Sequence, residues 1–283
     1  MNKLALGLVC LMMVLFSCSS DSSESDSPPI VASSGLVNKI TQSDPDGKLL
    51  VTTTFLYNGN KIVSESWKQN SFSMGTDVGY SYRVDYTYTG NLITNMKVSN
   101  IFRAPERLVM STNFAYDSNE NLISSVREQY FDSFKMTLKI SYAKIDNNTQ
   151  EFKIFTIDSR DNIEISSASG KIVFDINKNI LKMGSIDMAG SFSSFEYDSK
   201  SNPKKNIIGF NKIIYFDLPP NFSVIYSKPH LDRSNNILKT NIPGYYPTSN
   251  QYTYNADGYP IENKEYANYN GAKLNATYQY FYQ

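Results

Sequence analysis

Apolar and polar residues alternate in short runs along most of the chain. Between Tyr80 and Tyr88 every second residue is aromatic or aliphatic, and the residues between them are polar. Residues 110–116 and 136–142 show a similar alternation. A period of two places one kind of side chain on each face of an extended chain, so each run predicts a β-strand with one buried face. No apolar stripe with helical spacing is sustained, and we therefore expect little or no helix.

Each of these runs ends on an aromatic residue, usually tyrosine, and a polar turn follows. Nine such closing residues can be identified: Tyr57, Tyr88, Tyr116, Tyr142, Phe174, Tyr197, Tyr226, Tyr254 and Tyr280. They span 223 residues in eight steps. The resulting average period of about 28 residues is typical of repeat architectures.

The turns between the runs have the composition of hairpin connections. Asn58-Gly59 and Thr89-Gly90 suit tight turns, because glycine accepts a positive φ. Residues 117–121, 198–202 and 255–258 are longer turns rich in Asp and Asn. A second extended run follows most turns, so the repeating unit is predicted to be a β-hairpin, and the whole domain a meander of roughly 16–18 antiparallel strands.

A flat sheet of this width would leave its tyrosine-rich face in water. At about 4.8 Å per strand it would measure about 80 Å across, so we expect the sheet to curl until that face is covered. The predicted fold is all-β: an antiparallel meander of repeated β-hairpins forming one strongly curved sheet, rolled or open and barrel-like. The alternative is a β-propeller in which two units make one blade, although nine hairpins do not divide into whole blades.

The first residues have the pattern of an export signal. Lys3 precedes an apolar run over residues 4–16, which is too short to span a bilayer. The run ends in Leu15-Phe16-Ser17-Cys18, which resembles the lipobox of bacterial lipoproteins. That resemblance implies cleavage before Cys18 and acylation of Cys18, and hence a lipid anchor in the membrane.

The resulting organisation has three parts. Residues 1–17 are the predicted signal peptide, residues 18–35 the lipidated cysteine with a disordered Ser/Asp-rich tether, and residues 36–283 one hairpin-repeat domain. The dispersed acids that follow Cys18 resemble export signals of Gram-negative surface lipoproteins. We therefore expect anchoring at the outer membrane, on either its cell-surface side or its periplasmic side.

Composition excludes several kinds of chemistry. Without Lys3 the chain has 26 basic and 27 acidic residues, which gives no reason to bind nucleic acid. The two cysteines are Cys10, within the signal, and Cys18, which the anchor uses. The domain is therefore expected to lack a disulfide, a thiolate nucleophile and a cysteine metal ligand.

Several repeats resemble the YD repeats of RHS-type bacterial proteins, in which Tyr-Asp begins the turn. The nearest copies are residues 114–122, 195–198 and 252–260. The chain as a whole also resembles anchored bacterial lipoproteins that carry such repeats. The resemblance implies a β-sheet scaffold and no enzymatic activity.

Three groups of polar residues are candidates for reactive sites. His230 lies near Ser227 and Asp232, but no nucleophile elbow accompanies them. Asp117, Asn119 and Asn121 begin like a calcium loop, but the glycine required at the sixth position is Leu122. The acids that lie in or beside strands mostly fall on the polar face, which argues against a glycosidase pair: Glu65, Asp85, Glu128, Glu151 and Glu164. We predict no catalytic residue, metal or cofactor.

Aromatic residues outside the alternating faces are the remaining candidates. Tyr245 and Tyr246 lie in the rigid loop Pro-Gly-Tyr-Tyr-Pro, and Trp67 ends a strand beside a long loop. Such rings either stack on sugars or fold back to plug the end of the sheet. The preferred hypothesis is a non-catalytic anchored lipoprotein that acts as a binding or scaffold module for a glycan or an envelope protein. The alternatives are a hydrophobic-ligand carrier or outer-membrane assembly accessory, and a glycan hydrolase.

Overall fold

The computed structural model describes residues 35–70, 81–102, 104–158, 160, 163–185, 192–214 and 234–283. These residues belong to one compact unit, Ser33–Gln283. The predicted signal peptide, Cys18 and the tether lie outside the described residues.

The described residues of this unit form sixteen β-strands and a single turn of 3₁₀-helix, η1 (Phe210–Lys212). The strands are β1 (Val37–Ser43), β2 (Leu49–Asn58), β3 (Lys61–Gln69), β4 (Ser81–Thr89), β5 (Leu92–Asn100), β6 (Arg107–Tyr116), β7 (Leu122–Tyr130), β8 (Lys135–Lys144), β9 (Thr149–Asp158), β10 (Ile163–Phe174), β11 (Ile180–Ser185), β12 (Phe192–Ser201), β13 (Asn235–Asn241), β14 (Thr248–Tyr254), β15 (Pro260–Asn268) and β16 (Ala272–Tyr282).

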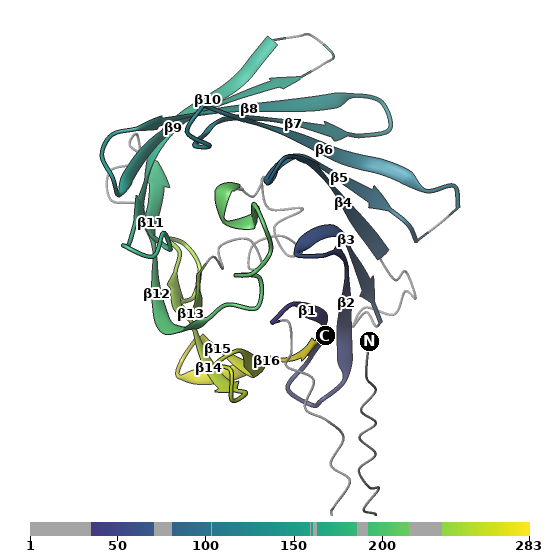
Figure 1. Ribbon diagram of the computed structural model, residues 1–283, viewed down its shortest axis with the longest axis vertical. Coiled ribbons are helices and arrows are strands. Elements are labelled where there is room, and N and C mark those ends of the chain that lie inside the picture. The colour runs from purple at the N-terminus through teal and green to yellow at the C-terminus, as the bar shows by residue number, and fades with distance from the viewer. Residues whose placement is uncertain are drawn as a thin grey trace, which may run out of the picture. The chain divides into compact units, whose positions relative to one another are not determined.

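The strands form one closed antiparallel barrel (Figure 1). Each strand pairs with the next along the chain, and β16 returns to pair with β1, where Ile40 lies opposite Tyr280. The predicted all-β hairpin meander is confirmed, and the propeller is wrong because all strands share one sheet. The open form of the curved sheet is also wrong. Closure pairs the two edges that an open sheet would leave with unsatisfied backbone groups.

Alternation along the strands separates the two faces of the wall. On β4, Tyr82, Val84 and Tyr86 are buried in the barrel, whereas Arg83 and Asp85 face outward and form an ion pair. Exposed charged side chains occupy the middle of the outer wall at Lys97, Lys139, Lys153 and Lys264. No helix in the described ranges is long and apolar enough to cross a membrane.

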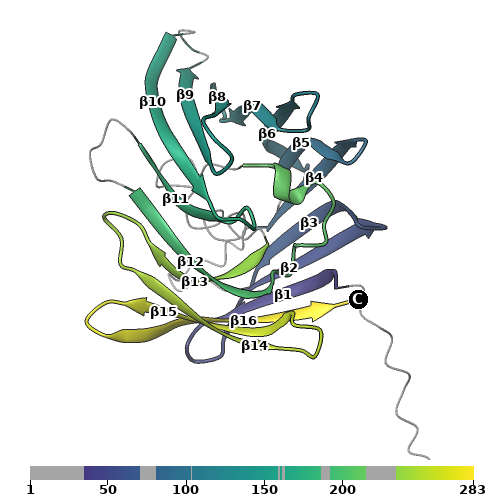
Figure 2. The ribbon, with the colours of Figure 1, turned by 60° about the vertical axis from the view of Figure 1, so that its left-hand side comes forward.

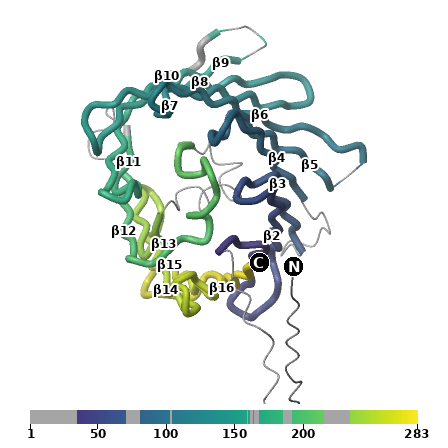
Figure 3. The backbone as a smooth tube through the Cα atoms, viewed as in Figure 1, coloured from purple at the N-terminus to yellow at the C-terminus, as the bar shows by residue number. Residues whose placement is uncertain are grey.

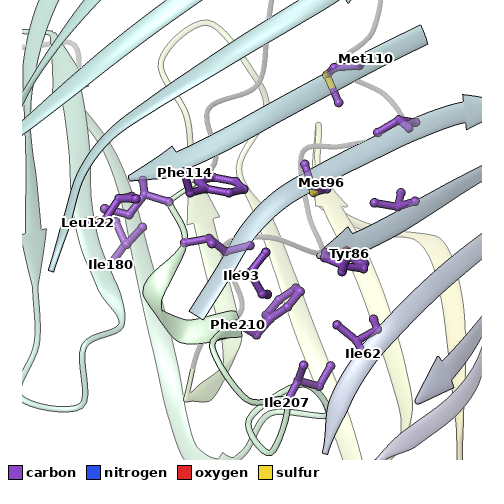
Figure 4. Close-up of a cluster of buried hydrophobic side chains, with 14 of the residues drawn as sticks. Ile62, Tyr86, Ile93, Met96, Met110, Phe114, Leu122, Ile180, Ile207 and Phe210 are labelled. Atoms are coloured by element: carbon purple, nitrogen blue, oxygen red, sulfur yellow. The ribbon is translucent and has the colours of Figure 1, made fainter. Parts of the chain in front are cut away.

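The chain enters its own barrel after β12. Residues 202–214, here called the inner segment, lie within the ring of strands (Figures 1 and 3). Ile207, Phe210, Ile213 and Ile214 of this segment are buried in the core. In Figure 4, Phe210 and Ile207 lie beside side chains of the β3–β5 wall. The interior next to these strands is therefore packed rather than hollow.

A buried ion pair fixes the inner segment to the wall. The Lys204 Nζ lies 3.3 Å from the Glu65 Oε2, and the two side chains are 6% and 0% exposed. The Tyr86 hydroxyl donates a hydrogen bond of 3.0 Å to the other Glu65 oxygen. The Lys204 ammonium also lies 5.0 Å from the ring centroid of Phe210, a favourable cation–π distance. Glu65 therefore faces inward, which corrects its assignment to the polar face.

The closing tyrosines give the repeat its physical meaning. Their rings line the core, and their hydroxyls donate hydrogen bonds to backbone carbonyls, several of them at the start of the return strand of the preceding hairpin. Among the closing tyrosines, the observed bonds are Tyr57 to Val37 (2.8 Å), Tyr88 to Ile208 (3.1 Å), Tyr116 to Ile93 (2.8 Å) and Tyr197 to Ile180 (2.9 Å). Two further tyrosines, each two residues from a closing tyrosine, donate in the same way: Tyr252 to Ile237 (3.1 Å) and Tyr282 to Pro260 (2.8 Å). We call this set the tyrosine belt. Tyrosine suits the position because a buried ring with a satisfied hydroxyl serves both packing and the backbone.

The two ends of the barrel differ. Because the strands are antiparallel and even in number, the first and last strands begin and finish at the same end, where Gln283 N donates to Leu36 O (3.1 Å). This terminal end also carries the tyrosine belt and the turns at 59–60, 90–91, 117–121, 145–148, 175–179 and 255–259. The opposite loop end carries the connections at 44–48, 101–106, 131–134, 242–247 and 269–271.

Candidate functional site

Three tyrosines form an exposed surface at the loop end. Tyr245 and Tyr246 lie between β13 and β14, and Tyr269 lies between β15 and β16. Their residues are 66%, 61% and 46% exposed. The rings of Tyr246 and Tyr269 meet edge to face, with centroids 4.5 Å apart and an interplanar angle of 64°. We call these three residues the aromatic rim.

Local sequence explains why the rim rings are held outward. Tyr245 N donates to Ile242 O (3.0 Å), which closes a turn with Pro243 and Gly244 at its centre. Gly244 has a φ of 82°, as the third position of a type II turn requires. Asn268 N donates to Pro247 O (2.9 Å) and thereby ties this loop to the neighbouring turn. The rim is therefore built from two loops that are joined through their backbones.

The exposure of Tyr245 and Tyr246 bears on one of their two interpretations. Both rings are largely exposed, so the expectation that they fold back to plug the barrel is wrong. Tyr269 was missed in the sequence analysis. Its signal was the Asn-Tyr-Asn-Gly stretch between two alternating runs, which is a turn sequence with one ring at its tip.

Trp67 does not belong to the aromatic rim. It is 7% exposed and forms part of the main buried cluster. Its position on β3 faces inward opposite Tyr82 of β4. Trp67 is therefore a core residue of the wall, away from any surface that it could share with Tyr245 and Tyr246.

The rim combines apolar ring faces with hydrogen-bonding groups. Each tyrosine presents an apolar ring face and a hydroxyl that donates and accepts hydrogen bonds. Asn268 and Asn270 are exposed in the same turn as Tyr269 and supply amide groups beside the rings. Flat apolar faces bordered by neutral polar groups match a sugar ring, which has C–H groups on its faces and hydroxyls at its edge.

The acids considered as a hydrolytic pair are engaged elsewhere. Glu65 is buried against Lys204, and Asp85 lies on the opposite face of the wall beside Arg83. Glu128 accepts hydrogen bonds from Lys135 (2.6 Å) and from Tyr130 (2.7 Å), and these bonds lower the pKa of its carboxyl below the usual value. Glu151 lies opposite Lys171 in the sheet, and Glu164 lies in β10. The geometry thus places Glu65, Asp85, Glu128 and Glu151 beside cations or on different faces, which does not form a glycosidase site. The side chain of Glu164 lies outside the described part of the structure.

The calcium-like stretch is a self-closed turn. Asp117 Oδ1 accepts bonds from the backbone N of Asn119 (2.8 Å) and of Asn121 (2.9 Å). Bonds from Asn121, first from its side chain, lower the Asp117 pKa. Asp44 closes its own turn in the same way. Within the described ranges no cluster of three or more His, Cys, Asp or Glu residues could hold a metal ion.

One predicted site and one rejected candidate fall outside the described residues. The predicted site is the lipidation site Cys18, and the rejected candidate is His230 with Ser227 and Asp232. The closing residue Tyr226 also falls there. Between Tyr197 and the return strand at Ile237, the described residues that follow β12 are the inner segment, which forms no strand (Figure 2). The expected return strand itself is present as β13.

Comparisons with known proteins found distant structural similarity. No protein-family model and no curated protein matches the sequence. A porin-like protein from Bacteroides uniformis ATCC 8492 aligns over 87% of this chain and 98% of its own, with 14% sequence identity and a TM-score of 0.49. A porin-like protein from Bacteroides vulgatus ATCC 8482 aligns over 88% of this chain and 98% of its own, with 13% identity and a TM-score of 0.35.

Proposed function

We propose that this protein is a non-catalytic envelope lipoprotein, anchored in the outer membrane through Cys18, that binds glycans at its aromatic rim. The observation that carries the proposal is the placement of Tyr245, Tyr246 and Tyr269 as exposed rings on two joined loops. The anchor rests on the resemblance of residues 15–18 to a lipobox.

Exposure and rigidity together support ligand binding at the rim. An exposed aromatic side chain does not contribute the stabilisation that its burial would provide. Three such rings side by side form an exposed apolar surface, and surfaces of this kind commonly bind a ligand or a partner. The type II turn at Gly244 holds Tyr245 before a ligand arrives, so little conformational entropy is lost on binding. The neutral amides of the adjoining turn favour a hydroxyl-rich ligand over a charged one.

A binding measurement tests the proposal directly. The lipidated chain is screened against immobilised neutral and acidic polysaccharides, and the affinity of the best binder is measured by calorimetry. Tyr245→Ala with Tyr246→Ala should weaken that affinity by at least about tenfold, as loss of central aromatic contacts typically does. Phe155→Ala, which removes a ring that is 37% exposed on the outer wall, is the matched control and should leave it unchanged.

The test also separates glycans from an envelope protein as the partner. If no polysaccharide binds but the rim variant loses a defined protein in pull-downs from envelope extracts, the glycan assignment is wrong. Tyr246→Phe refines the result, because it keeps the ring and removes only the hydroxyl. An affinity that survives Tyr246→Phe but not Tyr246→Ala indicates stacking.

The other two candidate functions receive less support. A hydrophobic-ligand carrier needs an open apolar interior, whereas Ile207, Phe210 and Ile213 of the inner segment fill the core beside the β3–β5 wall. A glycan hydrolase needs two acids across a cleft, whereas Glu65 and Glu128 are bonded to lysines. Hydrolysis of a bound glycan, lost on replacing either of two carboxylates, would overturn the proposal of a non-catalytic module.

A further inference from the structure

The outer wall carries exposed apolar side chains at the terminal end. Six of them occur just before or after the tyrosine-belt level on the strands, and we call this set the terminal apolar ring. Its members are Leu56 (60% exposed), Val63 (40%), Ile123 (43%), Leu181 (37%), Ile261 (42%) and Phe281 (39%). Ile145 (50%) and Ile176 (86%) extend the same apolar character onto the turns of that end.

These positions recur with the hairpin repeat. Val63, Ile123 and Leu181 each follow the buried aliphatic residue that opens a return strand, and Leu56 and Phe281 each precede a tyrosine of the belt. The register shifts where Tyr57 pairs with Ile62 and where Tyr116 pairs with Leu122, so these residues lie at corresponding heights. The set is interrupted, because exposed Glu196 and Thr87 occupy the position before Tyr197 and before Tyr88. Single exposed apolar residues are ordinary, so the sector in which they are neighbours carries the argument.

One sector of the terminal apolar ring is contiguous. Ile261, Phe281, Leu56 and Val63 lie on β15, β16, β2 and β3, which are neighbours through β1. In the gap, Lys39 of β1 lies with its Nζ 4.0 Å from the ring centroid of Phe281. This cation–π contact places a positive charge at the edge of the apolar sector, and cationic side chains beside aromatic and aliphatic ones are typical of surfaces that bind membrane interfaces.

The chain itself identifies the surface that this sector meets. The first described residue, Gly35, precedes β1 at the terminal end, and the predicted acylated Cys18 lies 17 residues before it. A tether of 17 residues reaches at most about 60 Å, so acyl chains at Cys18 would keep the terminal end within that distance of the lipid headgroups. An apolar sector with lysine at its edge then faces the bilayer, and the aromatic rim lies at the other end of the barrel.

We propose that the terminal apolar ring rests in the headgroup region of the bilayer, so that the barrel stands on its terminal end and presents the aromatic rim away from the membrane. The contact is interfacial: the charged middle of the wall stays in water, and only the rim of the terminal end enters the lipid. The inference depends on the anchor at Cys18 and does not depend on what the aromatic rim binds.

Single-cysteine labelling tests this orientation. The barrel sequence from residue 35 onward contains no cysteine, so one introduced cysteine can carry an environment-sensitive fluorophore. Val63→Cys, Ile123→Cys and Ile261→Cys probe the ring. Leu49→Cys, Leu108→Cys and Ile163→Cys are matched controls, because they replace aliphatic residues that are 40%, 36% and 60% exposed at the loop end.

The lipidated full chain with each label is reconstituted on phosphatidylcholine vesicles. The ring labels should shift to shorter wavelength and lose intensity to a bromolipid that is brominated near the headgroup, while the control labels keep their aqueous emission. Far-UV circular dichroism confirms that each labelled chain is folded. Aqueous emission at all six positions, or equal quenching at both ends, would overturn the proposal.

Flotation of the same vesicles separates this proposal from its premise. A chain that floats but shows aqueous emission at the ring is anchored without resting on its terminal end. A chain that fails to float with Cys18 intact contradicts the anchor itself, and with it this orientation. Glycan affinity, measured on the same labelled chains, reports on the aromatic rim alone.

Discussion

The terminal end and the loop end of the barrel join the same strands, but their turns differ in how regularly the sequence repeats. At the terminal end each hairpin repeats one device: a belt tyrosine bonded to a neighbouring carbonyl, often beside an Asp or Asn that closes its own turn. At the loop end the connections vary in length and sequence, and three tyrosines project into solvent.

Because of this difference, we expect substitutions at the two ends to affect different properties of the protein. The repeated end holds the inner segment through Glu65 and Lys204 and shields the core, so a substitution there acts on the free energy of unfolding. The variable end is free of those constraints, so a substitution there acts on binding. Loops on a rigid scaffold commonly carry function for the same reason.

The largest effect on stability is expected at the buried ion pair. Glu65→Ala leaves the Lys204 ammonium buried without its carboxylate and should lower the free energy of unfolding by about 3–5 kcal/mol. Urea unfolding followed by circular dichroism measures the loss. Glu65→Met combined with Lys204→Met is the control, because it removes both charges and keeps the volume.

That double variant should recover most of the stability that Glu65→Ala loses. If Glu65→Ala unfolds at the wild-type urea concentration, the inner segment does not depend on this pair. The terminal end would then owe its stability to the belt and to apolar packing alone.

A smaller loss is expected from a single belt hydroxyl. Tyr116→Phe keeps the ring but leaves the Ile93 carbonyl without this donor, which should reduce the free energy of unfolding by about 1–3 kcal/mol. Tyr266→Phe removes an exposed hydroxyl whose bond to Gln251 is 3.3 Å long, and should change it by less than about 0.5 kcal/mol. Equal losses in the two variants would remove the contrast between belt and outer wall.

The repeated end was also the more predictable from sequence. The alternation before Tyr88 and Tyr116 predicts strands with one buried face, and the polar stretch from Asp117 predicts a self-closed turn, because both signals are local. Barrel closure was not predictable, since Ile40 and Tyr280 pair across nearly the whole chain. Nothing local specifies that two distant edges will meet.

Two residues that were placed wrongly from the sequence follow the same irregularity in the backbone. A register shift pairs Leu56 with Ser64 but Tyr57 with Ile62, so Val63 is an extra residue on its strand. Such a bulge reverses the alternation beyond it, which turns Glu65 and Trp67 inward. Counting every second residue therefore misplaced Glu65, whereas Trp67 was considered as a surface residue because it ends a strand beside a long loop.

The aromatic rim was predictable only in part. The Pro-Gly step before Tyr245 predicts a rigid turn, and the structure confirms that turn. The contact of Tyr246 with Tyr269 joins two loops more than twenty residues apart, and it depends on how β14 pairs with β15. The inner segment was missed because residues 202–214 lack the alternation of the strands and show no helical stripe.

Alkaline pH provides a further test of the terminal end. Burial raises the pKa of Tyr88 from its ordinary value of 10.0 to about 12. Burial likewise raises the pKa of Tyr57 and of Tyr116. Above pH 10 these phenols ionise in the unfolded chain but remain neutral in the barrel. Their contribution to stability is therefore complete below that pH and is lost as the pH rises through the folded values.

Urea unfolding at pH 8, 10 and 11 measures this loss as a fall in the free energy of unfolding. Tyr88→Phe should show a shallower decline between pH 10 and 11 than the wild type, because one raised phenol is gone. Tyr246→Phe is the control at the loop end, where the hydroxyl belongs to an exposed residue, and its pH profile should follow that of the wild type. Parallel declines in all three proteins would show that the buried belt phenols do not set the alkaline limit.

The smallest effect on stability is expected at the aromatic rim. Tyr245→Ala with Tyr246→Ala removes two exposed rings and should change the free energy of unfolding by no more than about 0.5 kcal/mol per site. The same variant should lose glycan binding, so binding and stability separate at this end and not at the other. Gly244→Ala sharpens the contrast, because it strains the positive φ that holds Tyr245 without removing either ring. A loss of binding in Gly244→Ala with both rings present would show that the rim depends on how the rings are held and not only on their presence.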